Sequence, residues 1–321
     1  MKKRSIGVIC LFLVMLLSVG CGTRNTKSQS EEQTEEAIDF ELSMKPESGT
    51  YSCRFEGKEH ELILDIPEDA KGAPLVVMLH GYGGNAESFR SDTAFEKDAN
   101  EKGYAVLYVT GAPNPNDSTS ATGWNFEGLE NGNRDVEFLC ELARCVCEQC
   151  DLDASRVFAV GFSNGAFMAH RLAMEGQDTF AAVVSVAGMM SEGVWEKRND
   201  KNQVGVFQIT GEKDDVVPKN SDGSARFSKA PAIEDVMEYW AASNGLTLTE
   251  TANVGKKSIL TTYALSNDND GQVSTCQVWH LWIPDGRHSW PSEQITGVQT
   301  NQLILEFLLN APPKMVYRST I

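Results

Sequence analysis

The sequence predicts a single α/β domain, built on a mainly parallel β-sheet with helices on both faces. Short continuous apolar runs alternate along the chain with longer runs that fit helices. A strand covered on both faces is apolar throughout, because its side chains pack against helices on either side. The chain has 321 residues, 41% of them hydrophobic and 23% charged, which is enough for a large core. We see no internal repeat and no second domain.

The N-terminus has the pattern of a targeting segment. A charged start, Lys2-Lys3-Arg4, precedes an apolar stretch that is short for a membrane-spanning helix. The stretch ends in Leu17-Ser18-Val19-Gly20-Cys21, which resembles a bacterial lipoprotein signal cleaved before Cys21. A plain secretory signal with an incidental cysteine is the alternative. We expect a signal peptide over 1–20, a lipidated Cys21 with a polar, disordered tether over 21–40, and the folded domain over 41–321.

The chain is strongly acidic. Its formal net charge is −17 at pH 7, and loss of the three positive charges of the leader makes it −20. Such a surface repels nucleic-acid phosphates. We therefore expect no nucleic-acid partner, and contact with a membrane only through the lipid anchor. The sequence leaves the oligomeric state open.

Strands and helices are expected in alternation. Residues 50–55 and 60–66 alternate in polarity like an antiparallel pair around the turn residues 56–58. The later strands are apolar runs, at 74–79, 104–109, 156–160, 180–186, 204–210 and 276–283. Helices are expected at 86–102, 135–150, 231–244 and 292–309, and after the turn at 161–165.

Six cysteines lie beyond Cys10 and Cys21, namely Cys53, Cys140, Cys145, Cys147, Cys150 and Cys276. Four of them fall within the predicted helix 135–150. Because Cys140, Cys147 and Cys150 share the apolar stripe of that helix, we interpret them as small core residues, with room for one disulfide of unknown pairing. No histidine stands near, and zinc ligands normally come from a turn. We expect no metal and no cofactor.

The segment 157–165 carries the clearest sign of chemistry. An apolar run leads into Gly161-Phe162-Ser163-Asn164-Gly165, which fits G-x-S-x-G, and a helix-compatible run follows. In this pattern a strand turns directly into a helix and exposes the serine hydroxyl above the sheet edge. The glycines remove Cβ atoms that would collide in so tight a turn. We interpret Ser163 as a nucleophile; a plain turn between core elements is the alternative.

A serine nucleophile needs a base, and the base needs an acid to orient it. Of the three histidines after Ser163, His170 falls in the following helix and His280 in a buried strand. His288 lies in a loop between the last strand and the last helix, where a base can reach the serine. The acid should follow the strand 204–210, where Glu212, Asp214 and Asp215 are candidates that the residues alone do not separate.

The oxyanion formed during acyl transfer needs fixed N–H donors. One is expected to be the backbone N–H of Asn164, directly after the nucleophile, and the other that of Tyr82 in the glycine-rich loop 80–84. The position of His80 in that loop suggests that this side chain has a structural, hydrogen-bonding role. Trp124 and Trp290, near these loops, are candidate walls of the substrate cleft, with core packing as the alternative.

Five segments in a fixed order resemble the polyhydroxybutyrate depolymerase and feruloyl esterase family of secreted serine esterases. They are residues 80–85, 156–165, 180–188, 211–218 and 286–291, within a similarity that spans about residues 51–309. The resemblance implies an α/β-hydrolase-like fold. It also implies Asp214 as the acid, because that residue stands three positions after Gly211 and four before Pro218. Asp215 departs from the family pattern, which commonly has proline there.

The resemblance implies an extracellular serine esterase. Its substrate is expected to be either a feruloyl or acetyl ester on plant polysaccharide or a short polyester such as a polyhydroxyalkanoate. Anchoring at the cell surface favours the polysaccharide esters. A surface binding protein that keeps the fold without turnover is an alternative from another class. Peptidase or acyltransferase activity is a further one, because fold and triad do not select the acyl acceptor.

Overall fold

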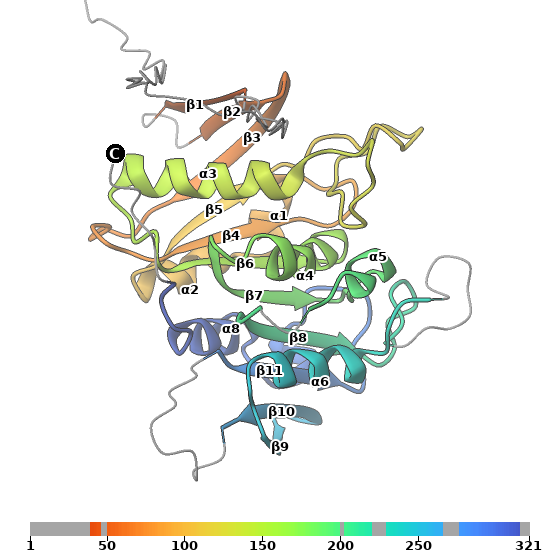
Figure 1. Ribbon diagram of the computed structural model, residues 1–321. Helices are drawn as coiled ribbons and strands as arrows, with labels where there is room; N and C mark the ends of the chain where they lie inside the picture. The colour runs from red at the N-terminus through yellow and green to blue at the C-terminus, as the bar shows by residue number, and fades with distance from the viewer. Residues whose placement is uncertain (1–38, 46–49, 200–201, 220–228, 266–275, 315–321) are drawn as a thin grey trace, which may run out of the picture. The chain divides into compact units, whose positions relative to one another are not determined.

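The computed structural model describes residues 39–45, 50–199, 202–219, 229–265 and 276–314 (Figure 1). The predicted leader, Cys21 and nearly all of the predicted tether lie outside these ranges. Within them, no helix is both long enough and apolar enough to cross a membrane.

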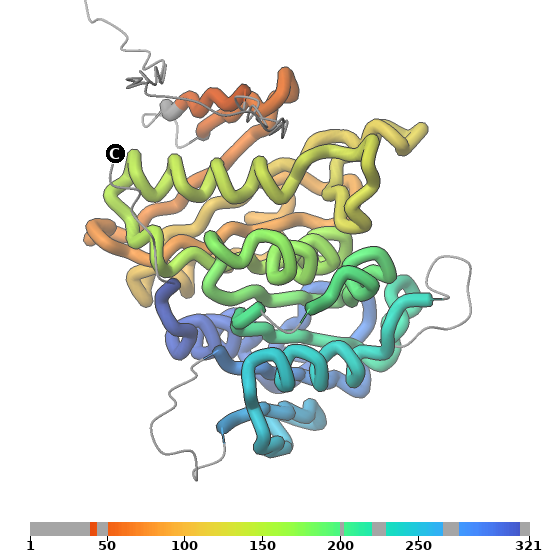
Figure 2. Tube along the Cα trace, viewed as in Figure 1, coloured from red at the N-terminus to blue at the C-terminus, as the bar shows by residue number. Residues whose placement is uncertain are grey.

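The described strands form one eleven-stranded sheet in the order β1-β2-β3-β5-β4-β6-β7-β8-β11-β10-β9. The six central strands are parallel, in the order β5-β4-β6-β7-β8-β11. The strands at both edges pair antiparallel, and the trace in Figure 2 shows these pairs at opposite ends of the sheet. Their bounds are β1 Phe40–Lys45, β2 Thr50–Phe55, β3 Lys58–Asp65, β4 Leu75–Leu79, β5 Ala105–Val109, β6 Val157–Phe162, β7 Phe180–Val186, β8 Gly205–Gly211, β9 Leu248–Val254, β10 Ser258–Ala264 and β11 Val278–Ile283.

Helices cover both faces of the sheet, as expected. Side chains of a strand alternate between the two faces, so in β4 Leu75 and Val77 join one core while Val76 and Met78 join the other. The first core, which contains Leu75 and Val77, is covered by α3, α4 and α6, and these helices cross in front of the sheet in Figure 1. The second core, which contains Val76 and Met78, is covered by α1, α2 and α8. The helices are α1 Ala86–Thr93, α2 Phe95–Glu101, α3 Asp135–Cys150, α4 Asn164–Glu175, α5 Glu192–Glu196, α6 Ile233–Ser243, α7 Glu293–Thr296 and α8 Thr300–Leu309.

All eight predicted strands are present, each within two residues of its expected ends. Four elements were not predicted, namely β1, α5, β9 and β10. The strand β9 lies at the sheet edge with six of its seven side chains exposed, so it has no alternation of polar and apolar residues to detect. The strand β1 begins at Phe40, the last residue of the predicted tether.

The prediction of one helix over 86–102 is wrong, because the backbone breaks at Ala94. Ala94 adopts the left-handed conformation, with φ 43° and ψ 31°, and separates α1 from α2. Phe89 and Phe95 both lie in the second core. In one continuous helix they would point about 120° apart, so the break lets both face the sheet. The expected helix 292–309 is also two helices, divided at Gly297, which has φ 71°.

The cysteines on the apolar stripe of α3 pack against the core, as predicted. Cys147 is buried in the first core, and Cys140 and Cys150 pack at its edge. Cys145 is half-buried. The six cysteines of the described chain are all free thiols, and burial raises the pKa of Cys147 to about 12.

Replacing Ala94 by glycine should stabilise the fold. Glycine reaches the left-handed conformation without the steric penalty that alanine carries, so Ala94→Gly should raise the free energy of unfolding by up to about 1 kcal/mol. Urea denaturation measures it. Ala242→Gly, at an exposed position in the last turn of α6, is the control and should lower stability, by less than the cost of about 1 kcal/mol that applies in a helix interior. Destabilisation by Ala94→Gly would contradict this account of the break.

Candidate active site

Ser163 occupies the turn between β6 and α4 in a strained backbone conformation, with φ 52° and ψ −116°. Both glycines of the motif are required by close contacts. A Cβ atom on Gly161 would lie 2.0 Å from the carbonyl oxygen of Gly165, and one on Gly165 would lie 2.1 Å from that of Leu79. The Ser163 N–H donates to the carbonyl of Val186 at 2.9 Å. The strand–turn–helix geometry predicted from the motif is therefore present.

His288 connects Ser163 with Asp214. Its Nε2 lies 2.9 Å from the Ser163 hydroxyl oxygen, and its Nδ1 lies 2.9 and 3.1 Å from the two carboxyl oxygens of Asp214. Because a carboxylate accepts a hydrogen bond, we assign the proton of the neutral ring to Nδ1. The unprotonated Nε2 then faces the serine hydroxyl and is placed to accept its proton.

Of the three acid candidates, the structure brings only Asp214 to His288 among the described residues. The Asp214 side chain is 1% exposed, and one of its oxygens also accepts the N–H groups of Val216 and Val217 at 2.9 and 2.8 Å. Glu212 instead accepts the indole N–H of Trp282 at 2.6 Å, and Asp215 is exposed.

The loops that carry the acid and the base touch at two glycines. A Cβ atom on Gly211 would lie 2.5 Å from the carbonyl oxygen of Gly286, which also accepts the Lys213 N–H at 2.8 Å. Any side chain at Gly211 would push the two loops apart. This contact sets the spacing between Asp214 and His288.

The other histidines are buried structural residues. His170 bonds Gln208 at 2.9 Å and His280 bonds Thr210 at 3.2 Å, and burial lowers the pKa of each to about 4. His80 accepts the Gly111 N–H on Nε2 at 2.9 Å and donates through Nδ1 to the carbonyl of Gly81 at 2.6 Å. The structural role expected for His80 is confirmed.

Tyr82 and Asn164, the predicted oxyanion donors, lie beside one pocket of about 200 Å³. Among the described residues, no protein acceptor is seen for the backbone N–H of either. Eight of the ten residues that line the pocket come from the loop 110–134, between β5 and α3. Tyr82 is 53% exposed, and its hydroxyl contacts Asp117 and Thr119 at 2.6 Å each.

The two tryptophans predicted to wall the cleft lie in different places. Trp124 is 2% exposed, lines the pocket, and donates its indole N–H to the carbonyl of His80 at 3.0 Å. Trp290 packs edge-on against Phe89, with ring centroids 5.7 Å apart, and donates to Asn301 at 3.1 Å. Trp290 is not among the residues that line this pocket, so its part in binding substrate stays a prediction.

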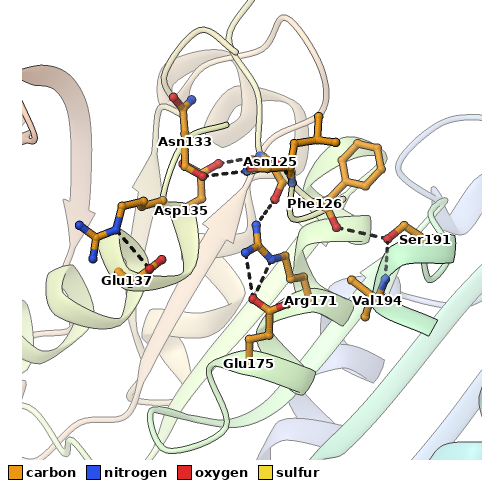
Figure 3. Close-up of polar contacts among 11 residues, drawn as sticks. Asn125, Phe126, Asn133, Asp135, Glu137, Arg171, Glu175, Ser191 and Val194 are labelled. Carbon is orange, nitrogen blue, oxygen red and sulfur yellow. Dashed lines mark hydrogen bonds and ion pairs between the residues drawn. The ribbon is translucent and has the colours of Figure 1, made fainter. Parts of the chain in front are cut away.

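The side chains that hold residues 110–134, the pocket loop, in place were not predicted from the sequence. The Asn164 amide accepts the N–H of Trp124 at 2.7 Å and donates to its carbonyl at 3.3 Å. Asn125, the residue after Trp124, donates its backbone N–H to Asp135 at the start of α3, and its carbonyl accepts from Arg171 of α4 (Figure 3). An asparagine in a loop gives no sequence signal for such contacts, because its partners are set by the fold.

The described residues hold no group of three or more histidine, cysteine or acidic side chains arranged to bind a metal.

The sequence comparisons agree with the motifs. Residues 62–216 match the sequence profile of the family described as Esterase PHB depolymerase. The resemblance to this family is confirmed. The match ends two residues after Asp214, so Ser163 and Asp214 lie inside it and His288 lies beyond it.

Three curated proteins are also similar in sequence to this chain. NocK of Nocardia uniformis subsp. tsuyamanensis is 34% identical over 171 residues, 52% of this chain and 46% of NocK. Acetylxylan esterase A of Emericella nidulans is 26% identical over 143 residues, 43% of this chain and 45% of that protein. Feruloyl esterase B of Piromyces equi is 25% identical over 183 residues, 55% of this chain and 33% of that protein. The matched part of the chain thus spans less than half the length of each relative.

Among solved structures, the acetyl xylan esterase from Aspergillus awamori is similar with a TM-score of 0.54 and 14% identity, covering 78% of this chain and 94% of that one. Likeness at this identity concerns the fold. The α/β-hydrolase-like fold predicted from the sequence is confirmed.

Asp135, at the edge of the site, is 1% exposed, and burial raises its pKa to about 6 against the opposing influence of the Asn125 N–H and Arg171. A carboxyl whose pKa is raised on folding stabilises the folded state most at a pH below its pKa in the unfolded chain. This stabilisation is lost as the pH rises through its pKa in the folded protein.

As pH rises from 4 to 7, Asp135→Asn should therefore gain stability relative to the wild type by about 3 kcal/mol, since the pKa of Asp135 is raised to about 6. Urea denaturation across that range measures the difference. Asp285→Asn is the control. Hydrogen bonds from Lys213 and Lys257 lower the pKa of Asp285 below its usual value, so the stability difference between this variant and the wild type should stay constant between pH 4 and 7. A constant difference for Asp135→Asn would refute the assignment.

Proposed function

We propose that this protein is a serine hydrolase of carboxylic esters. The proposal rests on the continuous hydrogen-bonded chain from Asp214 through His288 to Ser163. A lone serine hydroxyl is a weak nucleophile, and an adjacent unprotonated imidazole held by a carboxylate is the arrangement that activates it. The match to an esterase family supports esters as the substrate class.

The reaction proceeds in two halves. The Ser163 oxygen bonds to the ester carbonyl carbon while its proton passes to Nε2 of His288, and the resulting imidazolium returns that proton to the leaving alcohol oxygen. The oxygen of water then bonds to the acyl carbon while His288 takes a proton from that water. His288 returns this proton to the Ser163 oxygen as its bond to the acyl carbon breaks and the carboxylic acid leaves. The N–H groups of Tyr82 and Asn164 stabilise the oxyanion, each donor being worth about 3 kcal/mol.

For the substrate we propose feruloyl or acetyl esters on plant polysaccharide. The similarity to an acetylxylan esterase and a feruloyl esterase supports this choice. Aromatic side chains such as Trp124 in the pocket suit a flat acyl or sugar group. The family description favours a polyhydroxyalkanoate or other short polyester as the second candidate. Rates with methyl ferulate, acetylated xylan and 3-hydroxybutyrate oligomers distinguish these classes.

We also propose that the enzyme acts outside a bacterial cell, held to the membrane by lipid on Cys21. The charged and apolar leader with its terminal cysteine supports this location. An extracellular position gives access to polymers that do not enter cells.

Ser163→Ala should abolish both ester hydrolysis and labelling by a fluorophosphonate probe, because the probe bonds only to an activated serine. Gel fluorescence after labelling measures the second effect. Ser155→Ala, two residues before the start of β6 and so at the other end of that strand from Ser163, should label like the wild type. An unlabelled wild-type protein would favour the alternative of a binding protein without turnover.

Asp214→Asn should lower kcat by about a thousandfold or more, since an amide cannot hold the required form of the His288 ring. The neighbouring Asp215→Asn removes the same charge at an exposed position and should retain most of the activity. Steady-state rates on one soluble ester provide the comparison. Equal losses in the two variants would show that net charge, and not orientation of His288, is responsible.

A further inference from the structure

The pocket beside the oxyanion donors is built mainly from one long loop, residues 110–134. A loop of this length keeps a fixed shape only if its backbone polar groups are satisfied and its chain is anchored. What anchors this loop therefore decides the shape of the pocket.

Asn125 is the centre of that anchoring. It is 4% exposed, and its side-chain oxygen accepts the Leu129 N–H at 3.2 Å, while its amide nitrogen donates to the carbonyls of Leu129 and Asn133 at 3.2 and 2.9 Å. The loop thus wraps around one side chain. A Cβ atom on Gly132 would lie 2.2 Å from the Asn125 amide nitrogen, so only glycine permits so close a wrap.

Two buried charged residues hold the backbone of Asn125 from outside the loop. Its N–H donates to the Asp135 carboxylate at 2.6 Å, and its carbonyl accepts from the Arg171 guanidinium. Arg171 is 8% exposed and is itself held by Glu175 at 2.9 Å. Figure 3 shows Asn125 between these two partners. We refer to Asn125, Asp135 and Arg171 as the Asn125 cluster.

The cluster is connected to the catalytic side of the pocket through α4. Arg171 lies on that helix, which begins with Asn164, and the Asn164 side chain holds Trp124, the residue before Asn125. On the other side, Ser191 donates to the carbonyl of Phe126 at 3.3 Å. Successive residues 124, 125 and 126 are therefore all attached to the scaffold: Trp124 to α4, Asn125 to α3 and α4, and Phe126 to Ser191 before α5.

We propose that the Asn125 cluster positions the pocket loop and thereby determines which esters the enzyme accepts by size. None of its members touches the reacting atoms, so Asn125 is a positioning residue. The inference rests on the proposed esterase function. It implies that a disturbed cluster affects esters that extend into the pocket and spares those too small to reach it.

The test compares Asn125→Asp with Asn244→Asp. Both changes are isosteric and place a carboxylate oxygen against a backbone carbonyl. Asn244 is likewise buried and bonds both backbone groups of Val204, which precedes β8 and does not line the pocket. For each protein, kcat and KM are measured on methyl acetate, methyl ferulate and acetylated xylo-oligosaccharide, and fluorophosphonate labelling reports the state of Ser163.

Asn125→Asp should lower kcat/KM for one or both large esters by about tenfold or more relative to methyl acetate, chiefly through KM, while Asn244→Asp leaves the ratios as in the wild type. Asp135→Asn, which keeps an acceptor for the Asn125 N–H, should retain the wild-type ratios, and Asp135→Ala should lose them. If Asn125→Asp does not fold, the contrast between these two Asp135 variants decides by the same criterion.

Equal proportional losses on all three esters, or unchanged ratios in Asn125→Asp, would overturn the inference while the esterase function stands. Absence of both turnover and labelling in the wild type would instead overturn the esterase function, and the inference with it.

Discussion

The close approach of Gly165 to the end of β4 is the contact on which the site depends. With no Cβ at this position, α4 starts directly against the carbonyl of Leu79, and Ser163 is held in a backbone conformation that costs about 1–3 kcal/mol. The segment that leaves β4 at this point continues to Tyr82. One contact between backbones thus brings the serine, its neighbour Asn164 and the opposite oxyanion candidate to the same edge of the sheet.

A second close contact between backbones, that of Gly211 with Gly286, positions Asp214 and His288. The acid and the base follow β8 and β11, neighbouring parallel strands whose carboxyl ends meet at one edge. The approach of Gly211 to Gly286 lets the two loops touch, and the Asp214 carboxylate is then oriented by two backbone N–H groups. Rigid backbone contacts, more than side-chain packing, therefore set the geometry of the hydrogen-bonded chain.

The helix α4 has two roles in this arrangement. Its first residue, Asn164, is a proposed oxyanion donor, and Arg171, two turns later, holds the backbone of Asn125. The same rigid element thus supports the reacting centre and the wall of the pocket. In the proposed esterase, a change in the pocket loop would alter which ester fits without moving Ser163, so selectivity would be separate from the chemical step.

Local pattern in the sequence determined the strands, most helices and the positions of Ser163 and His288, because periodicity and motif spacing depend on neighbours along the chain. The tertiary structure decided what depends on distant segments. It selected Asp214 over Glu212 and Asp215 and broke a helix at Ala94 so that two phenylalanines face one core. It also joined Asn125 to two helices. The sequence carries no signal for such choices, since they follow from distances that exist only once the sheet has formed.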